Sequence, residues 1–99
     1  MSIERFTQEA LAPLIGESIS VCDTTTGKEL TTLSVEQVTA GQYETEEFSS
    51  LSVILKGTPD KHLPQNTYIL KHSTFGEVEL FIVPNAVDVY QIIVSRKKA

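Results

Sequence analysis

The 99-residue chain has a single cysteine, no tryptophan and no long apolar run. Because a disulfide needs two thiols, Cys22 excludes an internal disulfide and fits a reducing compartment. No apolar run approaches the roughly 20 residues that a membrane-spanning helix needs. The first residues also lack the basic start and apolar stretch of a secretory signal. We therefore predict a cytoplasmic protein without a membrane partner.

Basic residues are scarce as well. Eight lysines and arginines oppose thirteen acidic residues, for a net charge of −5. Three of the eight lie within 96–99, which leaves five basic against thirteen acidic residues, a charge of −8, on residues 1–95. An acidic surface repels phosphate backbones, so we predict no nucleic-acid partner. The segment 96–99 is interpreted as a solubilising basic tail.

Motifs that carry chemistry are missing. The sequence has no Gly-x-Ser-x-Gly elbow, glycine-rich phosphate loop or paired-carboxylate motif. A metal ion could in principle be bound by Asp60 and the two histidines of the sequence, His62 and His72. Their spacing, however, matches no zinc motif. Cys22 falls in a predicted strand and not at a helix N-terminus, where its pKa would be lowered. The sequence therefore predicts no catalytic residue, metal or cofactor, and it favours a non-enzymatic protein.

Short segments of alternating polarity are what the sequence does contain. The alternation predicts strands at 16–22, 29–39, 48–56 and 89–95, and a hairpin within 63–84 that turns at 74–76. Because no room is left for crossover helices, neighbouring strands must be mainly antiparallel. We predict one all-β domain over 1–99, a small antiparallel barrel or a two-layer sandwich of about six strands, with a short N-terminal helix.

The predicted helix occupies residues 6–15. Thr7 is a suitable N-cap, Pro13 limits the length, and Gly16 provides a stop. Its apolar residues are expected to plug one open end of the sheet; they are Phe6, Leu11, Leu14 and Ile15.

Two features predict how the strands end or bend. Within 29–39, Leu33 and Val35 share one parity while Val38 has the other. A β-bulge near residues 36–37 would restore the register and help a small sheet to curl. Pro84 is expected to end the second strand of the hairpin because it cannot donate a backbone hydrogen bond.

The second half of the chain carries the residues on which a family resemblance rests. They are Phe48, Leu51, Gly57, Pro59, Gln65, Tyr68, His72, Gly76, the run 80–84 and Tyr90. In this order they are similar to a small bacterial family classed as a domain of unknown function. Members typically show Phe-x-Leu-x-Phe-x-Gly-Pro, then Gln-Gly-x-Tyr, a His, a Gly, Leu-Phe-Leu-Val-Pro and a Tyr-containing strand. The likeness spans roughly residues 6 to 95. It brings no catalytic residue, cofactor or substrate.

The chain departs from this family pattern at two positions. Asn66 stands where the family usually has Gly, so the resemblance implies a positive φ at Asn66. Thr58 separates Gly57 from Pro59, which changes the turn in that region. The resemblance implies that Gln65, Tyr68 and Gly76 hold the framework together.

One functional hypothesis is an interaction or structural module that self-associates or docks into a larger assembly. Tyr43 and Phe75 fall in predicted loops, and exposed loop aromatics favour contact with another protein. The predicted strand 89–95, which carries Tyr90 and lacks proline, could pair as an edge strand with another copy. The predicted partner is therefore a protein, and a homo-oligomer is one form of it.

The alternative hypothesis is a small-ligand-binding or enzymatic β-barrel. His72 follows Tyr68 in strand parity, so both can point toward the interior or its rim. A pocket near Tyr68, His72 and Phe81 would then take the ligand.

Overall fold

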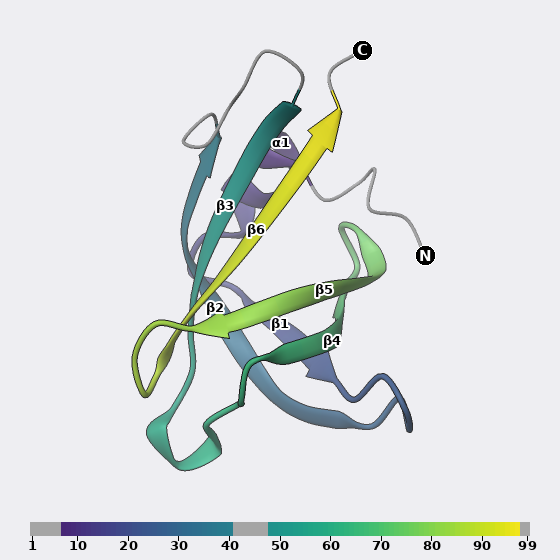
Figure 1. Cartoon of the computed structure of the whole chain (residues 1–99), viewed down its shortest axis with the longest axis vertical. Helices are drawn as coiled ribbons and strands as arrows, with labels where there is room; N and C mark the ends of the chain where they lie inside the picture. The colour runs from purple at the N-terminus through teal and green to yellow at the C-terminus, as the bar shows by residue number, and fades with distance from the viewer. Residues whose placement is uncertain (1–6, 41–47, 98–99) are drawn as a thin grey trace.

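The computed structural model describes residues 7–40 and 48–97. Within these residues six strands form a closed antiparallel barrel preceded by a short helix (Figure 1). The predicted all-β fold is confirmed, and the barrel is the correct one of the two predicted architectures. The strands are β1 (Ser18–Cys22), β2 (Glu29–Ala40), β3 (Phe48–Lys56), β4 (Asn66–His72), β5 (Gly76–Pro84) and β6 (Val89–Lys97).

The order around the barrel is β1-β2-β3-β6-β5-β4, and every neighbouring pair is antiparallel. The first three strands follow one another along the chain. β6 then lies between β3 and β5, so the last strand joins the β1-β2-β3 meander to the β4–β5 hairpin. The ring closes where β1 pairs with β4 over three residue pairs.

The helical segment consists of α1 (Gln8–Leu11) and the 3₁₀ turn η2 (Ala12–Leu14). The Thr7 hydroxyl accepts a hydrogen bond from the Ala10 N–H at 3.1 Å, which confirms the predicted cap. Gly16 has a φ of +91°, as expected of a residue that stops a helix.

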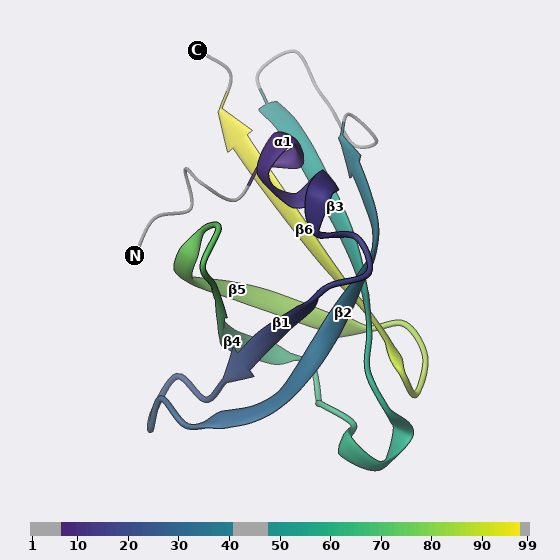
Figure 2. The same cartoon turned by 180° about the vertical axis from the view of Figure 1, so that it is seen from behind.

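The helical segment covers the end of the barrel where β3 and β6 extend beyond the other strands (Figure 2). Leu11 and Leu14 are buried in the core, as predicted for a plug. Ile15 is 51% exposed, so its predicted burial is wrong. Its backbone leaves the helical turn and forms a parallel bridge with Val35. Phe6 lies outside the described residues.

Alternate residues of each strand face the barrel interior and form one apolar core, as a strand period of two requires. The strand residues that form this core are Ile19, Val21, Leu33, Val35, Leu51, Val53, Leu55, Tyr68, Leu70, Val78, Leu80, Ile82, Tyr90, Ile92 and Val94.

The long strand β2 contains the predicted β-bulge. Its pairing with β3 shifts between Val35 and Gln37, which leaves one extra residue in β2. Val35 therefore pairs with Leu55, and Val38 pairs with Val53, on the same inner face. The bulge keeps apolar residues of both parities directed toward the core.

A second irregularity changes the position of Cys22. The β1–β2 register shifts between Val21 and Cys22, so Cys22 pairs with Glu29 and Leu30 is passed over. Cys22 is buried, and on its other side it pairs with Ile69 of β4. Leu30 is exposed.

The β4–β5 hairpin has the predicted tight turn, with His72 paired to Gly76 and a φ of +77° at Gly76. Pro84 ends β5, also as predicted. No described residue other than glycine has a positive φ, so the positive φ implied for Asn66 is wrong. Asn66 begins β4 instead, and its Oδ1 accepts the Thr67 N–H at 2.8 Å.

Candidate functional site

The barrel wall is weakly closed on one side of β6. β6 pairs with β3 over nine residue pairs, but it pairs with β5 only through Val83–Gln91 and Pro84–Tyr90. Beyond these two pairs the strands diverge: β5 crosses the barrel while β6 continues beside β3 (Figure 1). Among the described residues, no strand pairs with the facing edges of 76–82 and 92–97.

A shallow apolar hollow lies where these two strands separate. Phe81, Val83, Gln91 and Ile93 line it, and its volume is about 180 Å³. Phe81 and Ile93 are each 49% exposed, although both are large apolar side chains. We call these four residues the β5–β6 groove.

Polar side chains hold one end of the groove in place. The Gln91 amide Nε2 donates to Ser52 Oγ at 3.0 Å, and its Oε1 accepts from Asn85 Nδ2 at 3.2 Å. Gln91 therefore connects the turn after β5 with β3. The Gln91 side chain is held in position at this end of the groove, since its amide both donates and accepts a hydrogen bond.

Acidic residues precede Phe81 along the exposed face of β5. Glu77 Oε1 lies 3.2 Å from Lys71 Nζ, and the hydrogen bond to Glu77 is the main cause that raises the pKa of Lys71. Glu79 has no ion-pair partner among residues 7–40 and 48–97. The groove thus combines exposed apolar area with an acidic strand end.

Two of the three predicted contact residues are buried. Phe75 is 1% exposed, so its predicted exposure at the turn is wrong. Its ring stacks on His72 with 5.8 Å between centroids, because the turn folds its aromatic side chain back onto the barrel. Tyr90 has no exposed surface and so offers none for the predicted contact. Tyr43 lies outside the described residues.

Tyr90 serves as an internal hydrogen-bonding residue. Its hydroxyl oxygen accepts the Leu63 N–H at 2.9 Å. The His62 Nδ1 lies 2.9 Å from the Val87 carbonyl oxygen and 3.3 Å from the Tyr90 hydroxyl. Because a carbonyl only accepts, Nδ1 carries the hydrogen of this contact. Tyr90 therefore ties the segment before β4 to the core.

Tyr68, His72 and Phe81 do not form the predicted pocket. Tyr68 pairs with Leu80 and is buried, whereas Phe81 pairs with Thr67, one register step away on the opposite face. His72 lines neither the β5–β6 groove nor the hollow at Tyr68 that is described below. The predicted pocket is wrong because strand alternation separates Tyr68 from Phe81.

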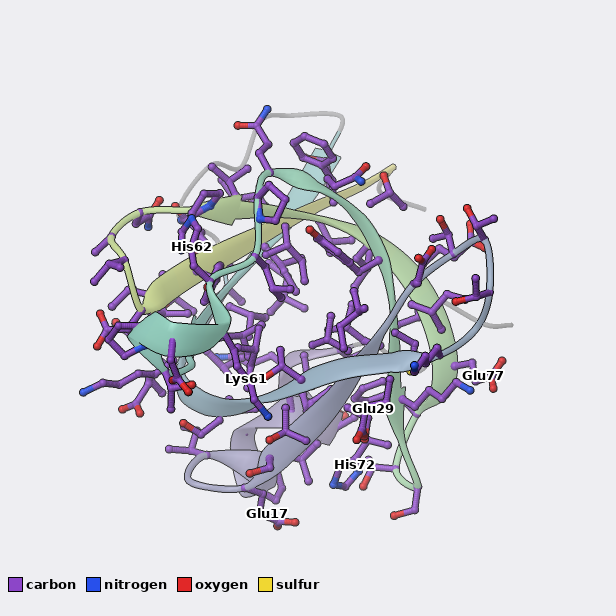
Figure 3. The ribbon with its side chains drawn as sticks, turned by 90° about the horizontal axis from the view of Figure 1, so that it is seen from below. Glu17, Glu29, Lys61, His62, His72 and Glu77 are labelled. Carbon is purple, nitrogen blue, oxygen red and sulfur yellow. The ribbon has the colours of Figure 1, made fainter. Side chains whose placement is uncertain are left out.

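His72 contacts the segment that leads into β1. Its Nδ1 accepts the Thr74 N–H at 3.0 Å, which leaves the proton on Nε2, 3.5 Å from Glu17 Oε1. Figure 3 shows His72 beside Glu17 and well apart from His62. The two histidines therefore do not converge on a shared site.

Tyr68 lines a second hollow, of about 350 Å³, between the β1–β2 turn and the segment that leads into β4. The Tyr68 hydroxyl donates to the Pro64 carbonyl oxygen at 2.6 Å. Burial raises the pKa of Tyr68, and the nearby Tyr90 and Asp23 raise it further. The hollow is lined by Asp23, Thr24, Leu30, Leu63, Pro64, Asn66, Thr67 and Tyr68.

Residues 7–40 and 48–97 contain no group of three or more His, Cys, Asp or Glu side chains placed to hold a metal ion. No helix in these ranges is long and apolar enough to cross a membrane. Cys22 is a buried free thiol.

These features define a small closed β-barrel domain with an exposed apolar groove at one seam. The chain belongs to the family described as domain of unknown function DUF6916, whose model matches residues 6–94. The resemblance seen in the sequence is thereby confirmed. No curated protein and no solved structure matches the chain.

Sequence reasoning named Phe81 but missed its neighbour Ile93. A signal was present, because 80–83 and 92–94 are uninterrupted apolar runs at the ends of two predicted strands. Such runs are typical of strands buried on both faces. In this barrel each run has one face in the core and the other at the groove.

Proposed function

We propose that the chain is a non-enzymatic protein-docking module and that the β5–β6 groove is its docking surface. The observation that carries this proposal is the exposure of Phe81 and Ile93 beside two strand edges that have no strand partner among residues 7–40 and 48–97. Contiguous exposed apolar surface beside polar residues is typical of interaction sites. Unpaired strand edges add backbone donors and acceptors that an extended protein segment can use.

The charge around the groove favours a protein over a nucleic acid. Glu77 and Glu79 lie on the same exposed face of β5 as Phe81, and the chain carries a net charge of −5. Phosphate backbones would be repelled by this surface. An extended polypeptide with apolar and basic side chains would be attracted to it.

Site-specific photo-crosslinking in cells tests the proposal. A photoreactive phenylalanine analogue at Phe81 is expected to crosslink the chain to a polypeptide. The same analogue at Val87, which is 56% exposed and outside the groove, is the matched control. Absence of a crosslinked polypeptide at Phe81, or equal crosslinking at Val87, would overturn the proposal.

The hollow at Tyr68 supports a second candidate function, the binding of a small organic amine. Its wall combines the Asp23 carboxylate with the exposed apolar side chain of Leu30. A ligand that binds the folded state raises its melting temperature. Millimolar alkylamines should therefore raise the melting temperature of the chain, and Asp23→Asn should abolish the increase. No rise in the wild-type melting temperature, or an equal rise in Asp23→Asn, would reject this second proposal.

A further inference from the structure

We infer that the partner in the β5–β6 groove is a second copy of this chain, whose β6 edge continues the ladder of β5. This inference rests on the proposed docking function of the groove. It adds the identity of the partner and the way in which the two chains pair.

The register of the existing pairs carries the argument. Val83 pairs with Gln91 in an antiparallel ladder. If that ladder continued along β5, Phe81 would lie opposite Ile93 and Glu77 would lie opposite Lys97. Within one copy these residues do not pair, because the strands diverge after Val83 and Gln91 (Figure 1). Each copy therefore carries two edges that suit each other but do not meet.

Side-chain chemistry along the two edges is complementary. Aromatic and β-branched residues opposite one another stabilise a strand pair, as do opposite charges. Phe81 and Ile93 supply the apolar pair, and both are half-exposed in a single copy. Glu77 near the start of β5 and Lys97 at the end of β6 supply the pair of opposite charges. The overall charge of −5 would oppose association, so these local contacts must select the arrangement.

A two-fold axis makes this pairing reciprocal. Each copy offers one β5 edge and one β6 edge, so β5 of each copy can pair with β6 of the other. A reciprocal interface uses the same surface on both copies and closes at a dimer. It would also pair the two edges that have no strand partner within the described part of the chain.

Sedimentation of the full chain over micromolar to millimolar concentration tests the inference. The mass is expected to rise from the 10.9 kDa of one copy toward twice that value. A single species of 10.9 kDa over the whole concentration range would overturn the inference.

Substitutions in the groove locate the contact. Phe81→Glu is expected to weaken dimerisation by about tenfold or more, since it places a charge in an apolar contact. Val87→Glu makes the same change at an exposed apolar residue outside the groove and should have no effect. Equal effects of the two variants would contradict pairing through the groove. Thermal melts check that both variants remain folded.

Charge reversal tests the register. Glu77→Lys and Lys97→Glu should each weaken dimerisation by roughly threefold, because exposed ion pairs contribute modestly. Their combination should restore the wild-type affinity, since opposite charges again face each other. A double variant that dimerises no better than the single variants would overturn this register.

The results also separate the inference from the proposed function. A chain that stays monomeric but crosslinks to another protein through Phe81 retains the docking function and loses the self-pairing. A dimer that is insensitive to Phe81→Glu, together with no crosslink at Phe81, would reject both.

Discussion

The two edges of β6 differ in how much of the strand is paired. Toward β3 the strand is paired along its whole length, from Val89 to Lys97. Toward β5 it is paired only at Tyr90 and Gln91. One strand therefore contributes to a continuous sheet on one side and to a short seam on the other. The comparison shows that a barrel can be closed in topology although two of its neighbouring strands pair through only two residue pairs.

Burial follows the same division. Ile92 is 1% exposed in the core, whereas the next residue, Ile93, is 49% exposed at the groove. The two side chains have the same chemistry and differ only in the face of β6 that carries them. They provide a matched pair for separating the structural face of the strand from the proposed docking face.

The largest expected effect comes from that pair. Ile92→Ala should lower the free energy of unfolding by about 2–5 kcal/mol, because it leaves a cavity in the core. Ile93→Ala should change it by less than about 0.5 kcal/mol, as surface substitutions usually do. Chemical denaturation of dilute protein measures both values. Similar losses for the two variants would contradict the division between the faces of β6.

The next effect concerns Gly57, on the continuous side of β6. A Cβ at this position would lie 2.6 Å from Leu33 Cδ2 and 3.4 Å from Tyr90 Cε2, and both side chains are buried. Gly57→Ala should therefore lower the free energy of unfolding by about 1–3 kcal/mol through overpacking. Thermal or chemical denaturation checks this. An alanine variant as stable as the wild type would show that the core can yield at this point.

Tyr90→Phe tests the hydrogen bonds at the seam without removing the aromatic ring. The change leaves the Leu63 N–H without its partner at 2.9 Å. An unsatisfied buried donor costs about 1–3 kcal/mol, and we expect a loss in this range. Denaturation measures the loss. If stability is unchanged, another group or water must satisfy this N–H.

The smallest effect is a pH dependence at Tyr68. Its raised pKa means that folding favours the neutral phenol. This contribution is complete below the unfolded pKa of about 10 and is lost as the pH rises through the higher folded pKa. NMR titration of the ring carbon that bears the hydroxyl should give a midpoint above that of free tyrosine. Tyr68→Phe should flatten the alkaline loss of stability, and an unshifted midpoint would contradict the assignment.

Local signals in the sequence predict most of the elements. The Thr7 cap, the bulge after Val35 and the turn at Gly76 all depend on residues close to one another along the chain. The strands of the barrel lie within a few residues of the predicted segments, because burial on one face imposes a period of two. These predictions succeed because each one concerns a short piece of backbone.

The predictions of functional residues were less accurate, because they depend on which side chains meet in the folded barrel and not on a short piece of backbone. Phe75 lies in a turn, as predicted, yet the folded turn directs its side chain inward. Tyr68 and Phe81 belong to neighbouring strands, yet they occupy opposite faces. Proximity between strands does not bring side chains together unless register and face agree.

Polarity patterns and glycine positions in the chain are sufficient to specify six antiparallel strands and an N-terminal plug. Two further properties arise only in the folded barrel: the closure of the wall and the divergence of β5 from β6 after two residue pairs. Both depend on how twisted strands pack around a shared core, and that packing is set by contacts between residues far apart in the chain.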